Sequence, residues 1–188
     1  MLIHAGAGGV GHVAIQLAKR KQARVLTTVS GKEKADFAKF LGADEVIFYS
    51  QEDVVDSVLN LTGGKGADLV FDTVGSAVFK ESIGATAHFG RIITLLGLPE
   101  MDYSEARLRN LLIGFELMLT PMLRDLPEAR NKHIQILQQC ASWIDEGLLK
   151  PHIGRELTLS QAALAHDLIE DGHVTGKIVL SLTGSYDT

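Results

Sequence analysis

Glycines at a characteristic spacing near the start of the chain are suited to holding a phosphate group. Gly6, Gly8 and Gly11 fit the pattern G-x-G-x-x-G, with Gly9 and Val10 inside it. In this pattern one glycine permits a sharp turn after a strand, the next lets the backbone approach a pyrophosphate, and the third lets a helix pack closely on the strand. The N–H groups that begin this helix then face the anion, assisted by the helix dipole. No Lys-Ser or Lys-Thr pair follows, which excludes a GK[ST] phosphate loop.

The elements around this loop alternate between strand and helix patterns. The predicted strands are residues 1–4, 23–29, 46–49, 67–72 and 91–96, and the predicted helices are 9–20, 32–41, 53–61 and 76–87. Short connections in a β-α-β rhythm predict a parallel sheet covered on both faces. We therefore expect an α/β fold: a Rossmann-type, doubly wound parallel sheet in three layers. This context favours dinucleotide binding over a glycine turn that only packs.

The second half of the chain is less regular. The pattern predicts a helix over 103–112, a helix or strand over 114–120 ended by Pro121, a helix over 128–145, an extended segment over 151–159, a helix over 161–170 capped by Ser160, and a strand over 177–182. We place Cys140 and Trp143, on the apolar side of the helix at 128–145, in the core. We divide the chain into a dinucleotide-binding domain, residues 1–146, and a C-terminal helix–strand appendage, residues 147–188.

The end of the second strand indicates which dinucleotide the loop would bind. NAD sites place an acidic residue there, about 20 residues after the glycines, to bind the ribose 2′-hydroxyl. Here Ser30 takes that place, followed by Lys32 and Lys34. A hydroxyl and ammonium groups suit a 2′-phosphate, which favours NADP over NAD. The alternatives are that the lysines are solvated charges, or that Glu33 reaches a ribose hydroxyl.

Other polar residues allow fewer conclusions. Asp72 ends the fourth strand, where it would either contact the cofactor or cap a turn. His4 is more typical of a buried structural histidine than of an acid/base. His166 and His173 have no third ligand, so we expect no metal site. No catalytic triad is recognisable, and the catalytic residues remain unknown.

Composition narrows the functional classes. The chain has 188 residues, 46% hydrophobic and 22% charged, and a formal net charge of -5, which argues against nucleic-acid or anionic membrane partners. No apolar run approaches the length of a membrane span, and no signal-peptide pattern precedes the first strand. The single cysteine excludes an internal disulfide and suits a reducing compartment. We therefore expect a cytoplasmic protein.

Several sequence runs resemble one family. HAGAGGVG at residues 4–11 and AIQLAK at 14–19 resemble the medium-chain dehydrogenase/reductases, in particular the zinc-free quinone oxidoreductases. Further matches follow in the family order: LGADEVI at 41–47, FDTVG at 71–75, GRII at 90–93 and TGKIVL at 175–180. The resemblance spans nearly the whole chain.

The resemblance implies a cofactor, NADPH, and a set of residues around it. Residues matching Ser30, Lys34 and Tyr49 surround the adenosine 2′-phosphate in that branch, although Tyr49 by itself would be only a strand-end aromatic. The family lays its cofactor along residues matching Gly9, Val10, Asp72, Val74, Leu96 and Gly97. The implied reaction is hydride transfer from NADPH to a small-molecule substrate, a quinone or an activated enone.

The resemblance also implies an assembly and a missing part. It makes residues 114–120 an edge strand, with Phe115, Leu117 and Leu119 on one face, through which two copies would form a homodimer. Family members begin with a separate catalytic domain that this sequence lacks, and residues from about 147 onward normally return to it. We therefore expect this chain to bind its cofactor but to turn over substrate poorly. Alternatives are a non-catalytic nucleotide-binding module or redox sensor, and the cofactor domain of a zinc-type alcohol dehydrogenase.

Overall fold

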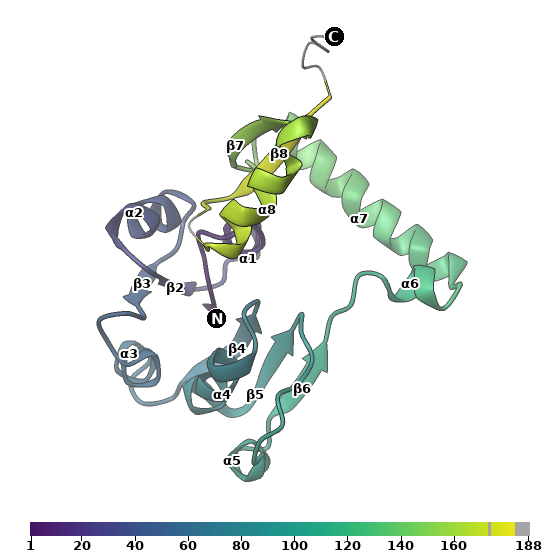
Figure 1. Ribbon diagram of the computed structural model, residues 1–188. Coiled ribbons are helices and arrows are strands. Elements are labelled where there is room, and N and C mark those ends of the chain that lie inside the picture. The colour runs from purple at the N-terminus through teal and green to yellow at the C-terminus, as the bar shows by residue number, and fades with distance from the viewer. Residues whose placement is uncertain (173, 183–188) are drawn as a thin grey trace.

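A six-stranded parallel sheet forms the centre of the protein (Figure 1). The computed structural model describes residues 1–172 and 174–182. The six strands are β1 (Leu2–Ile3), β2 (Leu26–Val29), β3 (Glu45–Phe48), β4 (Ala67–Asp72), β5 (Thr86–Thr94) and β6 (Leu112–Phe115). Their order is β3-β2-β1-β4-β5-β6, and every neighbouring pair is parallel. This is the doubly wound order, so the predicted Rossmann-type fold is confirmed.

Helices cover both faces of this sheet. They are α1 (Gly11–Arg20), α2 (Lys32–Phe40), α3 (Val54–Leu61) and α4 (Ser76–Ala85). α1 and α2 pack in one apolar cluster that includes Ile3, whereas α3 and α4 pack in another that includes Leu2. Because adjacent strand residues point to opposite faces, these clusters lie on opposite sides of the sheet. The three layers of the prediction are therefore present.

The connection after β5 differs from the prediction. It holds α5 (Ser104–Leu108), β6, α6 (Thr120–Leu123) and α7 (Pro127–Asp145). The predicted helix over 103–112 ends early because Asn110 adopts a left-handed φ of 54°, after which β6 begins. The edge strand therefore spans Leu112–Phe115 and not residues 114–120. Pro121 does not end an element: it lies in the first turn of α6, where a missing N–H costs nothing.

Helix α7 projects away from the sheet (Figure 1) and has no buried residue. Ile136 and Leu137 are 60% and 68% exposed, and Cys140 and Trp143 are only half-buried. The prediction that Cys140 and Trp143 belong to the core is therefore wrong. The Trp143 ring instead lies against the Arg20 guanidinium of α1, with 4.3 Å between the guanidinium carbon and the ring centroid. An amphipathic pattern shows that a helix has an apolar face, but not that the same chain covers it.

The C-terminal segment forms a small unit beside α1. It consists of β7 (Ile153–Thr158), the 3-10 turn η1 (Leu159–Gln161), α8 (Ala162–Glu170) and β8 (Lys177–Ser181), and its two strands form a separate parallel sheet. The predicted cap, Ser160, lies inside η1. Thr158 takes the capping position because the helical turn begins earlier, and it forms a capping box with Gln161. The predicted domain boundary at residue 146 stays a prediction.

Candidate cofactor-binding site

The glycine loop lies between β1 and α1, as predicted, and two of its glycines are required by close packing. A Cβ on Gly6 would collide with the Thr27 side chain, and a Cβ on Gly11 would collide with the Ala5 carbonyl. The left-handed residue of the turn is Ala5, with φ 51°, a residue that the sequence pattern did not identify. Gly8 donates its N–H to the Ala5 carbonyl at 2.9 Å. The loop is thus folded around the Ala5 peptide.

The N-terminus of α1 faces this loop without a cap. Val10, 39% exposed, occupies the N-cap position, and no side chain accepts a hydrogen bond there. The first turn of α1 also contains no acidic residue. By contrast, Asp53 caps α3 by accepting a hydrogen bond from the Asp56 N–H. An uncapped helix N-terminus carries free N–H groups and a positive dipole end, which suit an anion.

Lys177, the first residue of β8, brings a positive charge to the same loop. Its Nζ would lie 3.2 Å from a Cβ placed on Gly9, and Gly176 donates its N–H to the Ala7 carbonyl at 2.9 Å. A cation beside a helix N-terminus is unfavourable unless an anion shares the site. Lys177 belongs to the TGKIVL run, but only the folded chain places it against the glycines, 168 positions away in sequence.

The predicted 2′-phosphate residues lie at the carboxyl ends of β2 and β3. Ser30 and Tyr49 are exposed, and the Ser50 hydroxyl, 3.4 Å from the Ser30 carbonyl, joins the two strand ends. Gly31 occupies the N-cap of α2, which also lacks a side-chain cap. Lys34 differs from the simple expectation, because its Nζ donates to the Gly172 carbonyl at 3.2 Å, beyond the end of α8. The ammonium therefore connects α2 to the C-terminal segment.

Asp72 caps the turn after β4, the second of its two predicted roles. Its carboxylate accepts the N–H groups of Val74 and Gly75 at 3.0 and 2.8 Å and the Thr94 hydroxyl at 2.8 Å. The side chain is fully buried. It therefore shapes the Val74–Gly75 turn from beneath, and a direct contact with a ligand stays a prediction.

Two further predicted residues lie beside this turn. Leu96, like Val74, is 44% exposed, and Gly97 is also exposed. A Cβ on Gly75 would contact Leu96, so the ends of β4 and β5 lie side by side. We call the exposed residues Val74, Leu96 and Gly97, which follow β4 and β5, the ledge.

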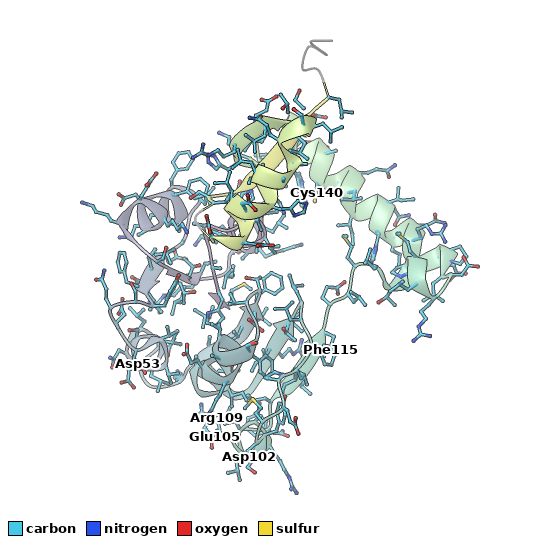
Figure 2. The ribbon with its side chains drawn as sticks, viewed as in Figure 1. Asp53, Asp102, Glu105, Arg109, Phe115 and Cys140 are labelled. Carbon is cyan, nitrogen blue, oxygen red and sulfur yellow. The ribbon has the colours of Figure 1, made fainter. Side chains whose placement is uncertain are left out.

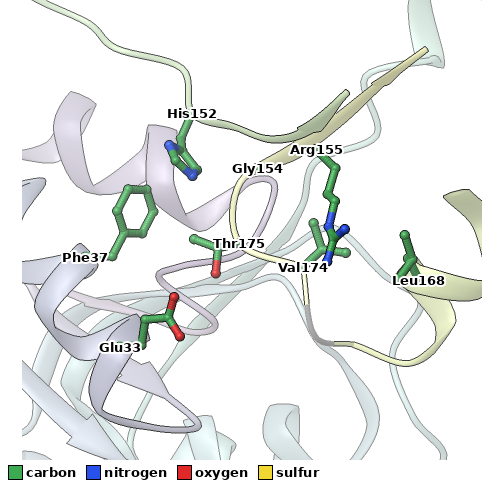
Figure 3. A pocket seen from close by; sticks show the side chains of 8 residues that line it. All are labelled: Glu33, Phe37, His152, Gly154, Arg155, Leu168, Val174 and Thr175. Atoms are coloured by element: carbon green, nitrogen blue, oxygen red, sulfur yellow. The ribbon is translucent and has the colours of Figure 1, made fainter. Parts of the chain in front are cut away.

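A pocket of about 350 Å³ joins residues from distant parts of the sequence. It contains two predicted residues, Tyr49 and Val74. The remaining lining residues are His4, Ala5, Thr28, Val54, Val78 and Glu81. A second pocket, of about 400 Å³, lies between α2 and the C-terminal segment (Figure 3). It contains none of the residues predicted for NADPH, but it is lined by Glu33, the alternative ribose ligand.

Buried histidines support the loop in their neutral form. Burial lowers the pKa of His4 to about 4, although nearby Asp72 raises it. His12 is also fully buried: burial lowers its pKa, a hydrogen bond with Gly8 raises it, and Lys177 is among the charges that lower it. His4 thus has the structural character that the sequence favoured.

Within the described part of the chain, no three His, Cys, Asp or Glu side chains gather in a metal-binding group. His173, half of the histidine pair weighed above, lies outside the described residues. No helix in residues 1–172 and 174–182 is long and apolar enough to cross a membrane.

A glycine loop leading into an uncapped helix above a doubly wound sheet defines a Rossmann-type domain. Residues 41–180 match the family of zinc-binding dehydrogenases. The chain belongs to this family, and with it to the medium-chain dehydrogenase/reductase superfamily.

Known relatives show the extent of the likeness. The chain is 33% identical to a quinone oxidoreductase of Pseudomonas aeruginosa, over 96% of its own length and 55% of the relative's. It is 30% identical to a 2-haloacrylate reductase of a Burkholderia species, over 96% of the chain and 54% of the relative. A mycobacterial protein complexed with NADPH superposes with a TM-score of 0.83 at 29% identity, over 95% of this chain and 56% of that one. The chain spans about half the length of these relatives.

Removing the Lys177 charge should weaken dinucleotide binding. We expect Lys177→Gln to reduce affinity for NADPH roughly tenfold, about 1.4 kcal/mol, because a charge-assisted contact to the pyrophosphate is lost. The difference in NADPH affinity between wild type and Lys177→Gln should be smaller at high salt, because salt screens the charge. Calorimetric titration measures it, with Lys65→Gln, an exposed lysine before β4, as control. Equal losses in both variants would contradict a local role for Lys177.

Proposed function

We propose that this chain is the NADPH-binding portion of an oxidoreductase that transfers hydride to a quinone or an activated enone. The observation that carries the proposal is the N-terminus of α1, which has no side-chain cap and no acidic residue in its first turn and has the Lys177 ammonium beside its glycine loop. The N-terminus of α2, at the same edge of the sheet, also lacks a side-chain cap and has Ser30 and Lys34 in the sequence around it. Two anionic groups of one ligand suit this arrangement. The likeness to a quinone oxidoreductase and to an NADPH complex supports it.

In this proposal each part of the edge holds one part of the dinucleotide. The backbone of Gly9 and Val10 and the Lys177 ammonium hold the pyrophosphate, by the same chemistry as other helix N-termini. Ser30, Lys34 and the first N–H groups of α2 hold the 2′-phosphate, and Tyr49 borders the adenosine. Val74, Leu96 and Gly97 support the nicotinamide half.

Bound NADPH would supply the hydride, and the chain's own residues would bind and orient it. The pocket bordered by Tyr49 and Val74 lies beside the proposed cofactor site. The proposed nicotinamide ledge is open, since Val74 and Leu96 are each 44% exposed. Substrate binding and the catalytic residues therefore belong to the whole protein in this proposal. We propose a cytoplasmic location, which suits the single cysteine of this chain.

The choice of cofactor tests the proposal. We expect NADPH to bind more tightly than NADH, by about 1–3 kcal/mol, the scale of a charge-assisted contact. Lys34→Gln should narrow the gap and leave NADH binding nearly unchanged, because it removes the charge but keeps a donor for the Gly172 carbonyl. Lys39→Gln, at the other end of α2, is the matched control. A wild-type preference for NADH, or equal affinities, would overturn the NADPH assignment.

We expect the 188-residue chain to bind NADPH but not to catalyse its oxidation. A substrate must be held about 3–3.5 Å from the hydride donor, with water excluded, and the open ledge does neither. We expect saturable NADPH binding with NADPH oxidation by 1,4-benzoquinone close to the uncatalysed rate. Rapid, saturable turnover would show that the chain completes its own substrate site. If a longer protein that contains this chain also bound NADPH without oxidising it, the alternative of a nucleotide sensor would be favoured.

The edge of the sheet at β6 supports a homodimer as part of the proposal. Within the described residues, β6 pairs only with β5, and Figure 2 places Phe115, 62% exposed, on this edge. Leu117 and Leu119, which we expected on the strand, are 50% and 43% exposed in the connection that follows. An apolar edge strand recruits a partner strand.

Phe115→Lys should convert the dimer to a monomer, because it places a charge on the proposed shared edge, at the end of β6. Light scattering coupled to gel filtration measures the mass. Phe40→Lys serves as the control, since Phe40 is 78% exposed on α2, near the opposite edge. A wild-type protein that is monomeric at all concentrations tested would refute the proposed assembly.

A further inference from the structure

A buried histidine joins three elements beneath the glycine loop. His4, 1% exposed, follows β1. Its Nε2 lies 3.0 Å from the Ser82 hydroxyl oxygen of α4, and its Nδ1 lies 3.4 Å from the Thr28 hydroxyl oxygen of β2. The Ala5 N–H donates to the same Thr28 oxygen at 3.1 Å. The cofactor contacts proposed above do not involve this imidazole.

The hydrogen bonds in this network have one consistent direction. Ser82 donates its only hydroxyl hydrogen to the Val78 carbonyl at 2.8 Å, so it accepts from His4 Nε2–H. A neutral imidazole protonated at Nε2 leaves Nδ1 as an acceptor. Nδ1 therefore accepts the Thr28 hydrogen, which turns the Thr28 lone pairs toward the Ala5 N–H. Burial keeps the imidazole neutral by lowering its pKa.

The Ala5 peptide at the end of this network determines the shape of the loop. Ala5 has φ 51°, a conformation that is costly for a residue with a Cβ. Its carbonyl accepts the Gly8 N–H and occupies the space that a Cβ on Gly11 would need. A rotation of this peptide would move both the loop and the first turn of α1. A hydrogen bond to the Ala5 N–H therefore fixes the position of the glycine loop and of the first turn of α1.

We propose that His4 is a positioning residue for cofactor binding: it orients the Thr28 hydroxyl, which holds the Ala5 N–H and so fixes the glycine loop. The inference rests on the proposed function, because it concerns the same cofactor site. In this proposal Nδ1 is the atom of the imidazole that orients the Thr28 hydroxyl. The bond from Nε2 to Ser82 anchors the ring but does not reach the loop.

Two substitutions separate the nitrogen atoms. In His4→Asn the side-chain oxygen takes the place of Nδ1 and keeps the acceptor for Thr28. In His4→Gln the side-chain amide takes the place of Nε2 and keeps only the donor for Ser82. We expect NADPH affinity within about threefold of wild type for His4→Asn and roughly tenfold weaker for His4→Gln, with similar losses of thermal stability.

Thr28 provides a second pair of variants, should the His4 variants fail to fold. Thr28→Val removes the hydroxyl and should weaken NADPH binding as much as His4→Gln does. Thr28→Ser keeps the hydroxyl and should bind NADPH about as tightly as wild type. Ser82→Ala should lower thermal stability, because it removes the acceptor that anchors the imidazole at Nε2.

A cofactor-free measurement keeps this inference separate from the proposed function. Hydrogen exchange of the Ala5 amide, followed by NMR in the absence of NADPH, should be slow in wild type, His4→Asn and Thr28→Ser and much faster in His4→Gln and Thr28→Val. Slow exchange in all of them would overturn the role of His4, whatever the cofactor. A wild-type protein with this exchange pattern but no NADPH binding would overturn the proposed function and keep the network. Equal loss of NADPH affinity in His4→Asn and His4→Gln would reduce His4 to a packing residue.

Discussion

The Ala5 peptide, where β1 turns toward α1, is the contact on which the carboxyl edge of the sheet depends. Its carbonyl lies against Gly8 and Gly11 so closely that Gly11 tolerates no Cβ. This approach brings the N-terminus of α1 to the end of β1, and it lets Ile15 pack on the sheet, where it is fully buried. The position of the α1 N-terminus and the core beneath it are thus set by the same turn. A change that relaxes the turn would disturb binding and packing together.

The C-terminal segment is attached to this same region. Gln16 exchanges hydrogen bonds with the backbone of Lys150, and the His152 N–H donates to His12 Nε2 at 3.1 Å. His12 and Gln16 lie four residues apart on one face of α1, so the segment follows that face. The bond from Gly176 to the glycine loop then delivers Lys177. The proposed anion site therefore draws on both predicted parts of the chain, although each part has its own sheet.

The sequence predicted those features that depend on neighbouring residues. Strand and helix periodicity is local, and the glycine spacing identified the loop, so the order of elements and the position of the first helix were predicted well. Contacts between distant segments were not. Nothing near Lys34 in the sequence indicates Gly172 as its partner, and nothing near Gly9 indicates Lys177. Even within a single turn the sequence left the role of Asp72 open, because a carboxylate at a strand end can bind a ligand or cap a turn. The folded chain shows that three donors hold this carboxylate.

Exposed apolar side chains run from β6 into α7. Leu112, Phe115, Met118, Leu123 and Leu137 are each at least 60% exposed, and together they follow one another from the edge strand into the long helix. Hydrophobic periodicity predicts burial, but it does not tell which molecule provides the cover. Large contiguous apolar surfaces are rare on proteins that act alone. This exposed apolar surface fits the proposal that another protein segment covers it in the assembled protein. A partner strand at β6, as proposed, would cover the first part of this surface, and the apolar face of α7 would extend it.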